Sequence, residues 1–315
     1  MDAHSAPVEQ AARTAHAVRP YRVNLLMTAL EDDFTTPLAQ SVQSWHRTTP
    51  GGGTLDVDVA ASVLRCAIPP TPAGRYANAQ IDDYGGARLA HYPWRPPLRL
   101  EVRARTSLPI HPPDGPLTET AERAAMEVSG AGMQAFLRGT FGFGFWNAPL
   151  TVARGALRLP DAVWFFGASP PSEMRLVPGL PGRGWKAQVV HANRAGALVS
   201  GGAALGAVAW ARLTGREQMA ARLVRRMTGA SEAALDVDTT TWHDYALEWH
   251  PDAARFFVDG VETLRAPDPP RGPLGFVAWI DNQYAIATPR GQLRFGTLAT
   301  GSEWLELDAV RITAL

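Results

Sequence analysis

The segment Trp242-His-Asp-Tyr-Ala-Leu-Glu-Trp-His-Pro-Asp-Ala-Ala-Arg-Phe-Phe-Val-Asp-Gly260 has the pattern of a β-hairpin. In its first half every second residue is large and apolar, the period of a strand with two unlike faces. Pro251-Asp252 is a turn signal, and Arg255 to Val258 returns as an aromatic and β-branched strand. Asp259-Gly260 is a second tight-turn signal, because glycine accepts positive φ without a steric cost. Two turns in so short a segment predict a meander of antiparallel strands.

Composition narrows the class of protein. The chain has 315 residues, 30 of them basic and 30 acidic, so its formal net charge is zero. General nucleic-acid binders and membrane-surface binders carry a basic excess, and the balance argues against both partners. Hydrophobic content of 46% is enough for a full core, and 29 glycines and 26 prolines suit many short strands joined by turns. The single cysteine, Cys66, excludes an internal disulfide framework.

The N-terminal segment is polar. Residues 1–20 hold His4, Glu9 and His16 and lack an apolar core of signal-peptide length. No stretch of about 18 apolar residues exists, so we expect no transmembrane helix. We therefore predict a disordered tail over residues 1–20, a single domain over residues 21–315, and a cytoplasmic protein.

The density of short strand patterns predicts an all-β fold. Leu98 to Thr106 alternates apolar with charged residues, as a strand with one wet face does. Ala162 to Phe166 is wholly apolar, which suits burial on both faces or the lining of an apolar cleft. We expect one two-sheet antiparallel β-sandwich, or jelly roll. The exception is residues 203–234, whose apolar and arginine faces predict a helical excursion, with Ser231 capping a shorter turn.

Four stretches carry a family resemblance, in this order along the chain: Tyr76–Tyr84 with Leu100–Arg105, Gly139–Trp146, Trp242–Gly260, and Trp304–Ile312. They resemble the strand pair before the cleft, the cleft strand, the Trp-His-x-Tyr-x-x-Glu-Trp hairpin and the closing strand of glycoside hydrolase family 16. The hairpin is the most specific of the four. The resemblance implies a concanavalin A-like sandwich from about Tyr21 to Ile312.

The chain departs from that family at its catalytic strand. The family reads Glu-x-Asp-x-Glu there, or the same with one extra residue, which places two carboxylates on one face for a retaining mechanism. The equivalent segment is Pro160–Gly167, and its only acidic residue is Asp161 at the edge. Valine and phenylalanine can neither attack a sugar carbon nor donate a proton. We therefore expect the scaffold without the family's hydrolysis.

The best candidates for lining a ligand cleft are Trp146, Trp164 and Trp279. A tryptophan buries about 150–250 Å², so each ring that meets a ligand contributes on the order of 1 kcal/mol. Gly142 and Gly144 share a strand face with Trp146, which indicates that something approaches closely there. That partner is a neighbouring sheet or loop in one interpretation and a ligand in the other. Equally, all three tryptophans suit core positions.

Polar candidates stand near these tryptophans. Asp281 shares a strand face with Trp279, and polar groups at the mouth of an apolar cleft orient ligands. The same reasoning adds three side chains: Asn282, Asn147 and Tyr84. In the alternative interpretation, Asp281 and Asn282 only stabilise a turn.

Candidates for acid–base chemistry are weaker, because each lacks a partner at a defined spacing. They are Asp161, Glu173, His191, Lys186 and Asp281. No histidine pair has zinc spacing, and no phosphate loop or nucleophile elbow occurs, so we expect no metal and no cofactor.

Three functions stay open. In the first, a non-hydrolytic relative of family 16 binds a carbohydrate or another cyclic small molecule in an aromatic cleft. In the second, an enzyme has reused that cleft for an apolar, natural-product-like substrate; the lack of a signal peptide and the apolar segment around Trp164 favour it. The third is a structural or protein-interaction sandwich.

Overall fold

The computed structural model describes residues 29–85, 91–110, 136–147, 152–153, 156–157, 160–174, 176–177, 179–191, 229–287 and 293–315. The predicted tail over residues 1–20 lies outside these ranges. So does the predicted helical excursion as far as residue 228. Within the described ranges, no helix is long and apolar enough to cross a membrane.

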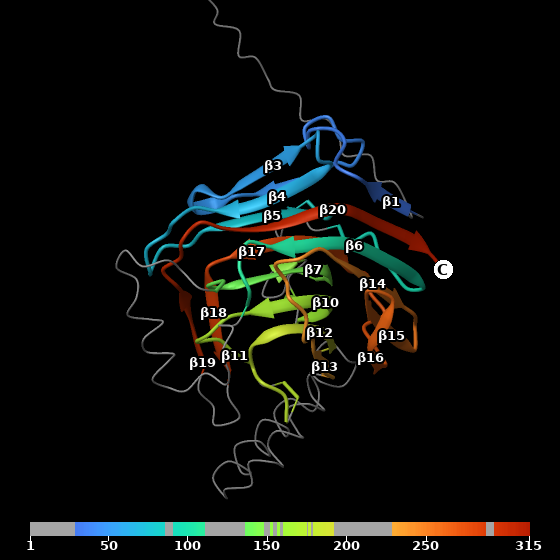
Figure 1. Cartoon of the computed structure of the whole chain (residues 1–315). Coiled ribbons are helices and arrows are strands. Elements are labelled where there is room, and N and C mark those ends of the chain that lie inside the picture. The colour runs from blue at the N-terminus through green and yellow to red at the C-terminus, as the bar shows by residue number, and fades with distance from the viewer. Residues whose placement is uncertain are drawn as a thin grey trace, which may run out of the picture.

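The larger sheet has eight strands and contains the hairpin (Figure 1). Strands β14 (His243–Trp249), β15 (Ala253–Val258) and β16 (Val261–Pro267) pair in sequence, which confirms the predicted meander. The sheet continues in this order through β6 (Leu98–Thr106), β20 (Glu303–Ala314), β4 (Val63–Ile68) and β3 (Thr54–Asp58). Strand β1 (Ala29–Asp32) also pairs with β20.

The second sheet has seven strands. Its order is β13 (Ser231–Ala234), β12 (Gly184–His191), β10 (Asp161–Ala168), β7 (Thr140–Trp146), β17 (Gly275–Asp281), β5 (Asn78–Asp82) and β2 (His46–Thr48). One prediction is wrong here: Ser231 to Ala234 is the edge strand and not a helical turn. Strand pairing outweighs the local helix propensity, because all four residues from Ser231 to Ala234 pair with β12.

Smaller elements complete the described residues. A three-stranded sheet contains β11 (Glu173–Met174), β18 (Gln283–Ala287) and β19 (Leu293–Thr297), and its β11–β18 pair is parallel. A two-stranded ribbon contains β8 (Val152–Ala153) and β9 (Ala156–Leu157). A single 3-10 turn, η1, spans Pro50–Gly52.

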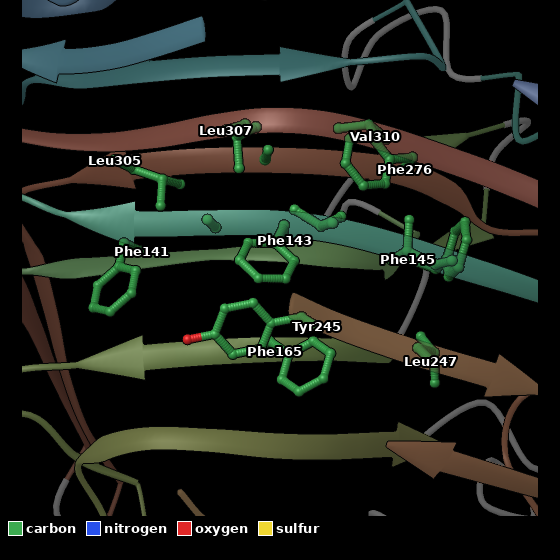
Figure 2. Close-up of a cluster of buried hydrophobic side chains, with 14 of the residues drawn as sticks. Phe141, Phe143, Phe145, Phe165, Tyr245, Leu247, Phe276, Leu305, Leu307 and Val310 are labelled. Atoms are coloured by element: carbon green, nitrogen blue, oxygen red, sulfur yellow. The ribbon is translucent and has the colours of Figure 1, made fainter. Parts of the chain in front are cut away.

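The two large sheets pack face to face around one apolar core. Figure 2 shows Phe141, Phe143 and Phe145 of β7 in one buried cluster with side chains of the eight-stranded sheet, among them Leu305, Leu307 and Tyr245. The three phenylalanine rings are at most 2% exposed. Phe143 packs edge-on against Tyr245 of the hairpin, with ring centroids 5.2 Å apart. The alternation of each strand therefore commits one face to this core, and the predicted antiparallel sandwich is confirmed.

Candidate functional site

The seven-stranded sheet has a second apolar cluster on the face turned away from the core. The side chains of Trp146, Trp164 and Trp279 meet there. The ring centroids of Trp164 lie 5.7 Å from those of Trp146 and 5.2 Å from those of Trp279. Trp146 and Trp279 are 6.4 Å apart with planes only 9° from parallel. We call this surface of β10, β7 and β17 the tryptophan face.

Strand register explains why the three rings meet. Trp164 of β10 stands opposite Gly144 of β7, and Trp279 of β17 stands opposite Gly142. A Cβ on Gly142 would lie 2.9 Å from the Trp279 ring. The glycine positions of β7 therefore leave room for large rings from the neighbouring strands. The atoms that approach Gly142 closely belong to the chain itself: the Phe165 carbonyl oxygen, 2.3 Å from that Cβ position, and then the Trp279 ring.

The tryptophan face has a graded exposure. Trp279 and Phe166 are 8% and 7% exposed, while Trp146 and Trp164 are half-buried. The side chains of β10 on this face are all apolar: Ala162, Trp164, Phe166 and Ala168. Trp146 and Trp164 are therefore the rings best placed to meet a flat ligand.

A buried polar network borders the face on the β12–β13 side. The Trp164 indole Nε1 donates to Oε1 of Gln188 at 2.6 Å. Gln188 Nε2 donates to Glu232 at 2.5 Å, and Lys186 Nζ donates to the same carboxylate at 3.2 Å. The side chains of Lys186 and Glu232 are 2% and 0% exposed. This network fixes the orientation of the Trp164 ring.

A second network borders the face on the β5–β2 side. Trp146 Nε1 donates to the Tyr84 hydroxyl at 2.7 Å, and Gln80 Nε2 lies 3.4 Å from that oxygen. Gln80 Nε2 also donates to Asp82 Oδ2 at 3.1 Å, and the same oxygen lies 2.9 Å from His46 Nδ1. Burial, reinforced by the Asp82 charge, raises the pKa of the Tyr84 phenol, so Tyr84 stays a neutral hydroxyl.

Asp281 lies on the same face at its third margin. Burial raises the pKa of its carboxyl to about 6, although hydrogen bonds from Thr140 and from the Gln283 backbone oppose that shift. Thr140 Oγ1 also accepts the indole N–H of Trp279 at 3.1 Å. A buried carboxyl is thus linked to the tryptophan face through one hydroxyl.

The two predicted asparagines hold loops. Asn282 Oδ1 accepts the Ala77 amide at 2.9 Å, and its Nδ2 donates to the carbonyls of Arg75 and Leu298 at 2.8 and 2.9 Å. Asn147 Oδ1 accepts the Asp161 amide at 3.2 Å. Both side chains are 3% exposed or less. Their place in a ligand site stays a prediction, and the contacts seen here are scaffold contacts.

The weaker acid–base candidates are not gathered at the tryptophan face. Asp161 and His191 are register partners on β10 and β12, and alternation points both side chains away from Trp164. Glu173 lies on β11 of the small sheet, 3.9 Å from Arg183. Only Lys186 and Asp281 lie on the same face as the tryptophans. Within the described ranges, no group of three or more His, Cys, Asp and Glu side chains could hold a metal ion.

Sequence reasoning missed the residues that border the tryptophan face most closely. They are His46, Gln80, Asp82, Gln188 and Glu232. A signal existed for Gln188, because a polar residue beside Lys186 in an otherwise apolar strand requires a buried partner. The sequence held no such signal for His46, because β2 is only three residues long and too short to show an alternating pattern.

Comparison with known proteins identifies similar structures only. No family model matches the chain, and no curated protein sequence matches it. A prokaryotic β-1,3-1,4-glucanase (lichenase) from a mouse hindgut metagenome shares 12% identity at a TM-score of 0.48, covering 92% of this chain and 100% of that one. The Crh5 transglycosylase in complex with NAG shares 11% identity at a TM-score of 0.45, with coverage of 92% and 85%. A pseudo β-1,3-glucanase of Mycobacterium tuberculosis shares 12% identity at 0.47, with coverage of 92% and 99%.

Proposed function

We propose that the tryptophan face binds a carbohydrate or another cyclic small molecule and does not hydrolyse a glycosidic bond. One observation carries the proposal: Trp146, Trp164 and Trp279 meet on one sheet face with hydrogen-bonding side chains along its borders. Ring ligands are recognised in this way, by apolar stacking in the middle and a few fixed polar groups around it. A structural or protein-interaction role would not need this combination.

The spacing of carboxylates supports binding without hydrolysis. In the described strands, Asp82, Asp281 and Glu232 lie on this face. Register places Asp281 four residues along β17 from the partner of Asp82, which separates the backbones of the two by about 13 Å along the strand direction. Glu232 lies five strands from Asp82, or about 24 Å. A retaining pair needs about 5–5.5 Å and an inverting pair about 6.5–9.5 Å.

The test is ligand binding to the full-length chain, measured by calorimetry and tryptophan fluorescence. Cellopentaose, laminaripentaose and naringenin represent two sugars and one apolar ring compound. Trp164→Ala removes one stacking ring worth about 1 kcal/mol, so we expect about fivefold weaker binding. Trp304→Ala, on the outward face of the other sheet, is the matched control and leaves affinity unchanged. Equal loss in both variants, or binding of none of the three ligands, contradicts the proposal.

A second function, an enzyme acting on an apolar substrate, is favoured by the apolar surface of β10 and by Asp281. A carboxyl with a pKa near 6 can hold or release a proton close to neutral pH. The two functions separate in one comparison. The enzyme is supported if the chain binds naringenin but neither pentasaccharide, and if the wild type converts naringenin to a product. The Asp281→Asn variant should then leave naringenin unconverted. The cytoplasmic location, the single domain and the absence of nucleic-acid and membrane partners stay predictions.

A further inference from the structure

We propose that His46, held by the buried carboxylate of Asp82, is an acid–base site at the border of the tryptophan face, where its Nε2 takes a proton from a ligand hydroxyl. In that step the O–H bond breaks, an Nε2–H bond forms, and the electron pair stays on the ligand oxygen. The reverse step returns the proton to that oxygen. Only the choice of a ring ligand as proton donor rests on the proposed function; the dyad stands on its own geometry.

The orientation of His46 is set by its carboxylate partner. His46 of β2 is the register partner of Asp82 of β5, and Nδ1 lies 2.9 Å from Oδ2. A carboxylate accepts hydrogen bonds, so this contact assigns the ring proton to Nδ1. Nε2 of the neutral ring is then left with its lone pair. The Asp82 side chain is 0% exposed, which keeps water from competing for that contact.

The dyad is joined to the tryptophan face by a continuous hydrogen-bonded chain. Asp82 Oδ2 accepts Gln80 Nε2, and the same nitrogen lies beside the Tyr84 hydroxyl that accepts the Trp146 indole. Register also puts Asp82 in line with Val277, Gly144 and Trp164 across β17, β7 and β10. A ligand stacked on Trp146 therefore lies on the same face of the sheet as His46.

A second histidine–aspartate pair in the hairpin shows what is special about His46. His243 Nδ1 lies 2.7 Å from Asp259 Oδ2, much like the first pair. Its Nε2, however, lies 3.1 Å from Thr241 Oγ1 and 3.0 Å from the Asp238 carbonyl, and its side chain is only 16% exposed. His46 Nε2 has no partner among the described residues, and the His46 side chain is 39% exposed.

The test measures imidazole reactivity site by site. Diethyl pyrocarbonate is added to the full-length chain, and each histidine's modification rate is followed by peptide mass spectrometry. Nε2 attacks a carbonyl carbon, the N–C bond forms, and ethyl carbonate leaves. We expect His46 to react about tenfold faster than His243, and Asp82→Asn to slow His46 about tenfold by losing the favoured tautomer. Asp259→Asn is the matched control and leaves the His46 rate unchanged.

A measurement on the wild type removes any dependence on how well Asp82→Asn folds. Long-range ¹H–¹⁵N NMR spectra, recorded at a pH where the ring is neutral, report which ring nitrogen carries the proton, and we expect it on Nδ1 of His46. The reverse tautomer, or a His46 rate no greater than that of His243, overturns the dyad. Slower modification in saturating cellopentaose or naringenin places His46 in the ligand site. A reactive His46 that a bound ligand does not protect overturns that placement and leaves the proposed binding function intact.

Discussion

The outward face of the eight-stranded sheet is ionic, whereas the outward face of the seven-stranded sheet is aromatic. On the first, Glu306 bonds to Arg65 and Arg105, and both guanidinium groups lie over the Trp304 ring, 5.0 and 5.6 Å from its centroid. Arg99 and Arg255 flank Phe257 in the same manner. We call this surface the ionic face. Trp304 on this face is therefore surrounded by charged side chains that pair with one another.

A hollow of about 570 Å³ opens on the ionic face. The arginines that line it already form ion pairs with neighbouring carboxylates: Arg99 with Glu248, Arg103 with Asp308, Arg255 with Glu262, and Arg311 with Glu31. On the tryptophan face, Lys186 and Glu232 form a buried ion pair at the border, and the middle of the face is apolar.

The two faces differ in what surrounds their tryptophans, and not in whether they carry tryptophans. Both faces follow the same strand alternation, and both carry half-buried tryptophans. On the ionic face cations already stack on the rings. On the tryptophan face the indole N–H groups are held by Tyr84, Gln188 and Thr140, which fixes the rings and leaves Trp146 and Trp164 half-buried.

The largest effect is expected from Glu232→Leu, which breaks the buried pair on the tryptophan face. Lys186 and Gln188 both lose their acceptor, and an uncompensated buried ammonium costs about 3–5 kcal/mol of unfolding free energy. Urea unfolding with a far-UV signal measures it. Lys186→Met combined with Glu232→Leu is the control, and it recovers most of the loss because no charge is left unpaired. A single variant as stable as the wild type would show that Lys186 reaches water.

A smaller effect is expected from pH, because a rise in pH changes the stability of the folded state in opposite directions through one carboxyl on each face. Burial raises the pKa of Asp281 to about 6, while hydrogen bonds and charges from Arg265 and Arg255 lower the pKa of Glu262 to about 2. The folded state therefore binds the Asp281 proton more tightly than the unfolded state does. The stability that this proton contributes is complete below pH 3.8 and is lost as the pH rises to about 6. Glu262 contributes stability above pH 4.5 that is lost as the pH falls toward 2.

Two variants separate these contributions by thermal unfolding over pH 2 to 8. Asp281→Asn keeps an oxygen that accepts from Thr140 and Gln283, and we expect it to flatten the decline in stability between pH 4 and 6. A single titrating group can change the free energy of unfolding by at most about 1.4 kcal/mol per pH unit. Glu262→Gln changes only the acid side of the profile. An unchanged profile for Asp281→Asn would mean that this carboxyl is ionised throughout.

The fold could be predicted because a strand with one solvent-exposed face alternates apolar with polar residues, and this alternation is visible in the sequence. Leu98 to Thr106 and the hairpin from Trp242 show it, and both were placed correctly. The tryptophan face was only partly predictable. Alternation shows which residues share a strand face, but only the pairing of β10 and β17 with β7 brings Trp164 to 5.2 Å from Trp279.

The polar borders could not be predicted from local patterns. His46 and Asp82 are 36 residues apart, and nothing near either residue indicates the other. Glu232 lies 46 residues from Lys186, in a segment whose composition favours a helix. Long-range pairing decided both cases, since burying these polar groups is tolerable only when each one finds a partner.

The smallest effect is expected from Glu248→Gln on the ionic face. Glu248 accepts from Arg99 at 2.8 Å and from Arg255 at 2.9 Å, and those guanidinium side chains are 31% and 33% exposed. Water solvates both cations when the carboxylate is removed, so the cost is about 1 kcal/mol or less. In 1 M NaCl, where the screening length is about 3 Å, most of that cost disappears. Urea unfolding at low and high salt measures it. A salt-independent cost as large as that of Glu232→Leu would mean that the ionic face is as dry as the border of the tryptophan face, and the contrast between the two faces would then fail.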